Sequence, residues 1–411
     1  MIKSRPGSPF QVILWVLSLQ FLLSPLSSGV YGQDDVPAPD VHPGAVLDGG
    51  GLRAVRAAYV GEAFYNAAGG TETGGTTHIH NLSIALSIGP TEDGDGLSGY
   101  VQLLGTFGGS VGDLSGDAQG ASNIEAPDAL RLYEAWAERR WRRASLLLGL
   151  YDSNRDFQVI ESAGIFINSS HGITPELAAS GRNGPSIFPV TSLAARGTLQ
   201  FGSTGYVRVA VLDGVPGNAG DESSFVHLSL GGDDGALLIG EVGIDALSGS
   251  SPLKVAIGGW SYTAWFEDAV HPEIVHSGAY GFYLLGETRL FESARGGQLN
   301  AFARAGYADE RVHSMASSLA AGLASSGFFP ARPEDQVGLG VAIVSQSQRL
   351  ERASAVEGLH PRNEVALELT YQASPLHNLQ IQPDIQYILH PGMSDTLSNC
   401  LLLAIRANLT F

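Results

Sequence analysis

The stretch that decides the fold is Leu401-Leu402-Leu403-Ala404-Ile405-Arg406-Ala407-Asn408-Leu409-Thr410-Phe411. Read with a period of two, its odd-numbered positions are all apolar, whereas the even-numbered ones include Arg406, Asn408 and Thr410. A strand of about ten residues with one apolar and one polar face is the repeating unit of a transmembrane β-barrel. The final aromatic residue is typical of the strand that barrel-assembly machinery recognises, so we expect that machinery as a partner.

The N-terminal segment has the pattern of an export signal. Lys3 and Arg5 precede a mostly apolar run from Phe10 to Leu26, and small residues follow it. A membrane anchor is the alternative, but the run is short and is interrupted by Gln20 and Pro25. We therefore expect residues 1–32 to be a cleaved signal peptide and residues 33–48 to be a flexible lead.

Composition narrows the classes further. The formal net charge of −18 argues against binding to nucleic acid, which requires a basic surface, and suits a water-filled lumen with a weak preference for cations. Cys400 is the only cysteine, so the chain can form no intramolecular disulfide. Glycine is frequent, with 53 residues, and only 16% of residues are charged, which favours strands joined by glycine-rich turns.

Alternating stretches recur along residues 49–411, which we interpret as one all-β domain. Clear examples are Tyr206–Val211, Leu299–Tyr307, Val365–Tyr371 and Leu379–Leu389. At roughly 20–25 residues for each strand and turn, the domain predicts a transmembrane antiparallel β-barrel of about 16 strands. A soluble β-sandwich also alternates, but here no second set of apolar faces is left to fill its core.

Two long insertions interrupt this rhythm, and we expect both to fold over or into the lumen. They run from about residue 154 to 191 and from about 310 to 334. The only helical candidates are short segments near them, Val312–Ser326 and Pro175–Ser180.

Sequence blocks spread over residues 49–411 resemble the carbohydrate-selective porin family, the OprB family. They are Gly50-Gly51-Leu52-Arg53, Ser122-Asn123-Ile124-Glu125, Arg131 to Trp136, Asp152 to Phe157, Phe166 to Ser169, Asp213 to Pro216, Gly327 to Arg332, Asp335 to Gly340, Glu364 to Tyr371, Gln382 to Tyr387 and His390-Pro391-Gly392. The resemblance implies a pore of about sixteen strands, narrowed by inward-folded loops and lined at the constriction by arginines and acids.

The same resemblance implies passive uptake of glucose-type sugars across the bacterial outer membrane. The barrel would be in contact with bilayer and lipopolysaccharide. A homotrimer is one assembly that it allows. Where many members have Asp-Gln, this chain has Glu287-Thr288, which leaves the preferred sugar open.

Sugar selection in a pore needs charged side chains that hydrogen-bond hydroxyl groups and aromatic rings that face the apolar side of a sugar ring. Strand-face arithmetic places Arg208 and Arg196 on the inner wall together with Glu134. Asp152 and Arg155 open the first long insertion. The predicted constriction is therefore Glu134, Asp152, Arg155, Arg196 and Arg208, and the alternative is that each is ordinary lumen wall. Trp136, Trp260 and Trp265 are candidate stacking surfaces, or else membrane-girdle residues.

Other functions lack their signatures. The chain contains no Gly-x-Ser-x-Gly, His-Glu-x-x-His or phosphate-binding glycine motif. His78-x-His80 has no neighbouring carboxylate or Cys, so we expect no metal and no cofactor. A general or cation-leaning diffusion porin is the main alternative. A barrel enzyme and an energy-coupled receptor with an N-terminal plug are weaker ones.

Overall fold

The computed structural model describes residues 52–90, 95–228, 231–247, 252–294, 296–327, 329, 331–356, 358 and 360–411. The predicted signal peptide (1–32) and lead (33–48) lie outside the described residues.

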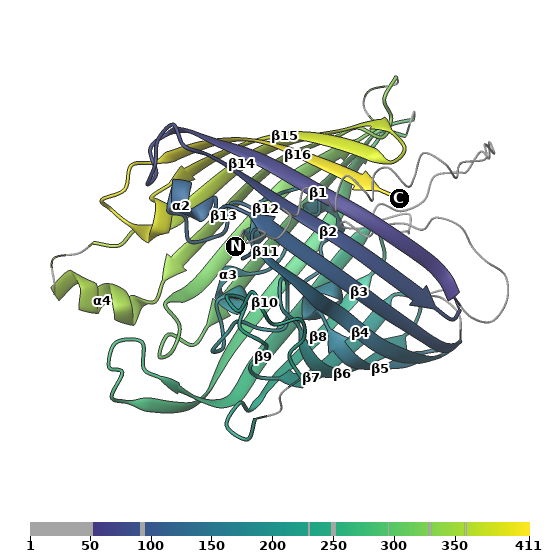
Figure 1. The fold of residues 1–411 in the computed structure, drawn as a ribbon, viewed down its shortest axis with the longest axis horizontal. Helices are drawn as coiled ribbons and strands as arrows, with labels where there is room; N and C mark the ends of the chain where they lie inside the picture. Colours follow the sequence, from purple (N-terminus) through teal and green to yellow (C-terminus); the bar gives the residue numbers. More distant parts are fainter. Residues whose placement is uncertain are drawn as a thin grey trace, which may run out of the picture. The chain divides into compact units, whose positions relative to one another are not determined.

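The described residues form sixteen antiparallel strands that close into a barrel, as predicted (Figure 1). Each strand pairs with its neighbours in the chain, and β1 pairs with β16. The strands are β1 (Leu52–Ala68), β2 (Thr76–Ile88), β3 (Gly96–Gly108), β4 (Ala129–Trp141), β5 (Ala144–Tyr151), β6 (Ser192–Phe201), β7 (Gly205–Asp213), β8 (Ala236–Asp245), β9 (Leu253–Glu267), β10 (Val275–Glu292), β11 (Gln298–Ala308), β12 (Met315–Ser326), β13 (Gln336–Gln346), β14 (Glu364–Leu376), β15 (Leu379–Leu389) and β16 (Cys400–Thr410).

The closing seam joins β1 to β16, with Ala58 opposite Thr410 and Ala68 opposite Leu401. The terminal strand therefore closes the barrel against β1, along Ala58–Ala68. On the inner side of the seam, Arg406 forms an ion pair with Glu62. Closure leaves no open edge for another chain to pair with.

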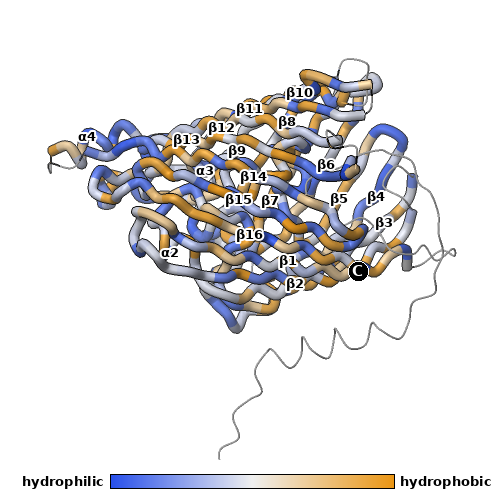
Figure 2. Tube along the Cα trace, turned by 90° about the horizontal axis from the view of Figure 1, so that it is seen from above, coloured by the Kyte–Doolittle hydropathy of each residue, from blue (hydrophilic) through white to orange (hydrophobic). Residues whose placement is uncertain are grey.

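Side chains alternate between a lipid-type outer face and a packed inner face. In β8, Leu237, Ile239 and Glu241 point inward and are buried, whereas Leu238 and Val242 point outward and are exposed. Figure 2 shows hydrophobic residues recurring along the strands, as this alternation requires. In β16, Leu403 and Ile405 are exposed while Leu402 and Arg406 are buried, which confirms the two faces read from the sequence.

The two ends of the barrel differ in their connections. At the short-turn end, tight turns such as Trp141–Ala144, Phe201–Gly205 and Leu376–Leu379 join the strands. The long-loop end carries the connections with the helical segments α2 (Gly112–Ser115), η2 (Ser153–Arg155), η3 (Glu161–Ala163), η4 (Ser169–His171), α3 (Pro175–Ala178), α4 (Gln348–Val356) and η5 (Pro391–Met393). Within the described ranges, none of the helices is both long and apolar enough to cross a membrane.

The helix predicted at Val312–Ser326 is wrong, because strand β12 begins at Met315 and continues to Ser326. Ala316, Ala320 and Ala324 are buried at intervals of four, a spacing that fits one face of a strand as well as one face of a helix. The second long insertion, 310–334, is therefore also wrong, since β12 occupies its centre. The helix at Pro175–Ser180 is confirmed as α3, Pro175–Ala178.

Candidate functional site

The connection between β5 and β6, Asp152–Thr191, folds into the barrel, and we call it the inner loop. Its apolar side chains, among them Phe157, Phe166 and Leu177, are buried in one cluster with inward residues of the wall such as Tyr283 and Phe302. One side of the barrel interior is therefore a packed core, which confirms that this insertion enters the lumen.

Glutamates on the barrel wall hold the backbone of the inner loop. Glu241 accepts a hydrogen bond from the Gln158 amide at 3.0 Å. Glu287 accepts from the Glu161 and Ser162 amides, both at 2.9 Å. Farther round the wall, Glu368 accepts from the amides of Ile167 and Asn168, at 2.6 and 3.2 Å. Loop amides that could pair with no strand therefore find carboxyl oxygens as acceptors.

A second connection, Gly109–Asp128 between β3 and β4, also lies against the inner wall. Glu364 accepts from the Ala118 and Gln119 amides at 2.8 and 3.0 Å, and Val111 and Ala121 are fully buried. Sequence reasoning missed this second loop. Its one available signal was the block Ser122 to Glu125, whose Ser122 hydroxyl bonds Glu62 at 2.6 Å.

At the start of the inner loop, Arg155 lies beside an acid and two aromatic rings. Its guanidinium pairs with Glu134 at 2.8 Å, and its Cζ atom lies 4.6 Å from the Tyr100 ring centre and 5.5 Å from that of Trp136. Tyr100 and Trp136 stack at 5.3 Å, and the Trp136 indole donates to Glu134. Because 27% of the Arg155 side chain stays exposed, it can still meet a solute.

The remaining predicted arginines have different surroundings. Arg196 is only 6% exposed and bonds Glu138 and Asp156, at 2.8 and 2.9 Å. Arg208 points inward as predicted, donates to the Asp156 carbonyl at 2.7 Å and keeps 24% of its side chain exposed. Arg208 can therefore face a solute, whereas Arg196 fixes Asp156 and hence the start of the inner loop.

Asp152 opens the inner loop and is tied on both sides. Its carboxylate accepts from the Asn154 amide at 2.8 Å and from the Tyr133 hydroxyl, while its own amide donates to Glu134. Burial, reinforced by the nearby Glu134 charge, raises the pKa of Asp152 to about 7. The group therefore changes charge near neutral pH.

The structure separates the three candidate tryptophans. Trp136 faces inward beside Arg155 and is half-buried. Trp260 also faces inward, but it is 3% exposed and enclosed by Tyr262 and His313, so its ring offers no open face. Trp265 is 60% exposed on the outer face, where a membrane girdle would lie.

Comparison with known proteins agrees with this geometry. The family model for "Carbohydrate-selective porin, OprB family" matches residues 91–411. The chain belongs to the OprB family. Porin B of Pseudomonas aeruginosa is 26% identical to this porin over 263 residues, which cover 54% of this chain and 56% of the relative. The match thus spans little more than half of the curated relative's length.

Solved structures support the fold of this porin. The high-pH structure of Pseudomonas putida OprB has a TM-score of 0.76 and 20% identity, covering 88% of this chain and 94% of the other. The channel DcaP of Acinetobacter baumannii has a TM-score of 0.53 and 11% identity, covering 88% of this chain and 98% of the other. Family and fold together identify an outer-membrane barrel of the porin type.

Proposed function

We propose that this porin lets small, glucose-type sugars diffuse passively into the periplasm and selects them beside Arg155. The observation that carries this proposal is the pairing of Arg155 with Glu134 over the stacked rings of Tyr100 and Trp136. The Arg155 guanidinium can hydrogen-bond sugar hydroxyls, and the aromatic rings offer apolar contact. Glu134, which is only 2% exposed, holds the guanidinium in place. Arg208 adds a second exposed donor on the same inner surface, whereas Asp152 and Arg196 position the loop.

The proposed route needs only weak binding. A solute that bound tightly would block the pore, so contacts with partly exposed groups suit conduction better than an enclosed pocket would. No covalent step and no cofactor enter this mechanism.

The proposal includes the steps that bring the chain to the membrane. Residues 1–32 would be removed as a signal peptide, and residues 33–48 would form a flexible lead. The terminal strand would be read by the assembly machinery, with lipopolysaccharide around the finished barrel and a homotrimer as one assembly. The amphipathic pattern of β16 and its place at the seam support recognition of this strand by the assembly machinery.

Liposome swelling tests the function. We expect vesicles containing the protein to swell faster with glucose than with an uncharged amino acid of similar size. The Arg155→Ala variant should reduce that preference about three- to tenfold, since a hydrogen bond to a charged group contributes about 1.5–3 kcal/mol and partial exposure weakens it. No swelling with any solute would overturn the proposal.

The Arg352→Ala variant is the matched control, because Arg352 lies exposed on α4. It removes the same charge and should keep the preference of the wild type. Equal swelling rates for all solutes of one size, together with a cation-selective reversal potential, would instead support a general diffusion porin. The net charge of −18 favours such a preference for cations.

A further inference from the structure

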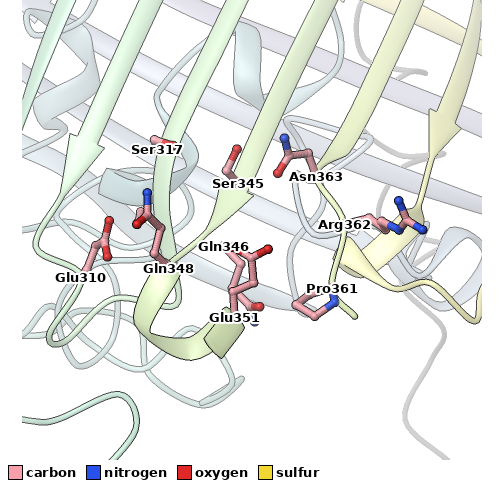
Figure 3. A pocket seen from close by; sticks show the side chains of 10 residues that line it. Glu310, Ser317, Ser345, Gln346, Gln348, Glu351, Pro361, Arg362 and Asn363 are labelled. Atoms are coloured by element: carbon pink, nitrogen blue, oxygen red, sulfur yellow. The ribbon is translucent and has the colours of Figure 1, made fainter. Parts of the chain in front are cut away.

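A polar recess lies at the long-loop ends of β12, β13 and β14, and a row of outward residues forms one side of it (Figure 3). Ser317 on β12 lies opposite Ser345 on β13. Asn363 comes just before Glu364, whose partner is Val344, so Asn363 lies across from Ser345. Figure 3 shows these three residues side by side on neighbouring strands.

Strand alternation assigns this row to the outer face and not to the lumen. Ala316 and Val344, the neighbours of Ser317 and Ser345 in their strands, are buried inward. Leu319, two residues along β12 from Ser317, is an exposed outward residue of the apolar band. The recess therefore begins where that band ends.

An aromatic residue borders the row. Tyr307 on β11 lies opposite Ser317, points outward and is 43% exposed. Outward aromatics at strand ends mark the level of lipid head groups in transmembrane barrels. At the next positions, however, this chain has Ser317 and Ser345, so the girdle gives way to hydroxyl groups at this point.

The recess has the size and chemistry for one sugar ring. Its volume is about 230 Å³, far more than the ~15 Å³ that one water requires and below the ~300 Å³ of drug-sized pockets. Besides the row it is lined by Glu310, Ala316, Gln346, Gln348, Glu351, Pro361 and Arg362. Amides and hydroxyls both donate and accept, as sugar hydroxyls require. Two carboxylates against one guanidinium disfavour an anionic group.

The walls of the recess are fixed to neighbouring connections. The Ser347 amide donates to the Ser314 carbonyl at 2.7 Å, and its hydroxyl donates to the Glu310 carbonyl at 3.2 Å. On the other side, the Arg362 amide donates to the Met393 carbonyl at 2.9 Å. Arg349 on α4 bonds Asp268 at 2.8 Å, which secures the start of α4. The site is therefore formed before a ligand arrives.

We propose that this recess binds the uncharged sugar head group of a glycolipid in the outer leaflet of the membrane. The apolar band below it, with Leu319 and Leu367, would contact the lipid chains, while the polar lining holds the head group. The site is separate from the proposed sugar route, since it lies at the ends of β12, β13 and β14, whereas Arg155 pairs with Glu134 of β4.

Native mass spectrometry with octyl glucoside, kept below its micelle concentration, tests this proposal. Protein in tetraethylene glycol mono-octyl ether should retain octyl glucoside, which shares the octyl chain but adds a sugar. The Ser345→Trp variant, which fills the recess, should abolish retention. The Glu351→Ala variant, which removes a lining carboxylate on α4, should weaken retention of octyl glucoside about tenfold.

The Phe282→Trp variant is the matched control, because Phe282 is an outward aromatic away from the recess and 56% exposed. It should retain octyl glucoside like the wild type. Glucose swelling should be unchanged in all three variants, so a failure of the pore function would not affect this result.

Three results would overturn the proposal. Retention of octyl glucoside no greater than that of the polyether detergent would exclude sugar recognition. Equal retention of free glucose would exclude a lipid source. A wild-type oligomer that Ser345→Trp splits into monomers, with no retained glycolipid in either form, would assign the recess to a contact between copies.

Discussion

Arg155 on the inner loop and Arg196 on the barrel wall carry the same charge inside the barrel, yet their surroundings give them different tasks. Arg196 is 6% exposed and held by two carboxylates, so exchanging one of its bonds for a sugar hydroxyl would cost buried contacts. Arg155 is 27% exposed and shares one carboxylate with an indole. Exposure, more than charge, therefore separates a group that meets solutes from one that holds the loop.

Asp152 gives a pH prediction at this scale. Its pKa of about 7 lies above the ordinary aspartate value because of burial and the Glu134 charge. Ionising Asp152 in the folded state therefore costs free energy. The folded state loses stability as pH rises from about 4 through about 7. We expect Asp152→Asn to match wild-type stability at pH 4 and to exceed it at pH 8, on the order of 1 kcal/mol.

Thermal unfolding in detergent at the two pH values would measure this difference. Asp395→Asn, in the β15–β16 connection, is a control that removes an exposed carboxylate. A difference between Asp152→Asn and wild type that is the same at both pH values would contradict the pKa argument.

Among the elements, the inner loop is held mainly from outside itself. Glu241, Glu287 and Glu368 come from three separate strands and each accepts from loop amides. Arg304 on β11 completes the set by donating to the His171 carbonyl at 3.0 Å. The conformation of the inner loop is thus determined by residues of the barrel wall as much as by residues of the loop itself.

Removing one of these acceptors should loosen the loop locally. Glu287→Leu leaves the amides of Glu161 and Ser162 unpaired, at about 1–3 kcal/mol for each buried group. Hydrogen exchange should show those amides losing protection, and single-channel currents should become noisier. Glu292→Leu, an exposed position on the same strand, should change neither. Unchanged protection in Glu287→Leu would show that apolar packing alone fixes the loop.

Sequence reasoning reached some of these elements and not others, for physical reasons. The period of two placed Arg208 on the inner face correctly, because alternation is a local property of a strand. It could not show that Trp260 is covered, since His313, one of the two residues that enclose its ring, is distant in sequence. Nor could it separate β12 from a helix, because small residues at intervals of four fit both. The entry of Asp152–Thr191 into the lumen came from family resemblance and not from periodicity.

For the whole molecule, the deciding property is that one face of every strand meets lipid-type surroundings while the other meets polar or packed ones. Outward residues such as Ile257, Leu284 and Leu339 are more than half exposed. A soluble protein with that surface would aggregate, whereas a bilayer satisfies it.

Paired arginine substitutions in β16 test this arrangement. Ile405→Arg places a charge near the middle of the outer face and should destabilise the membrane-embedded barrel by about 2–4 kcal/mol. Asn408→Arg, on the inner face beside Gln380, should cost much less. Denaturant unfolding in lipid vesicles would measure both, and equal losses would mean that the faces are assigned wrongly.

The seam between β1 and β16 also sets the order of events during folding. Its inner ion pair, Glu62 with Arg406, joins residues 344 positions apart. Contacts so distant in sequence form late and slowly, because a long stretch of chain must first be brought together. Until then β1 is paired only with β2, through thirteen residue pairs. Its other edge is open and must be protected from pairing with other chains. A nascent barrel of this kind therefore depends on being shielded until β16 pairs with β1.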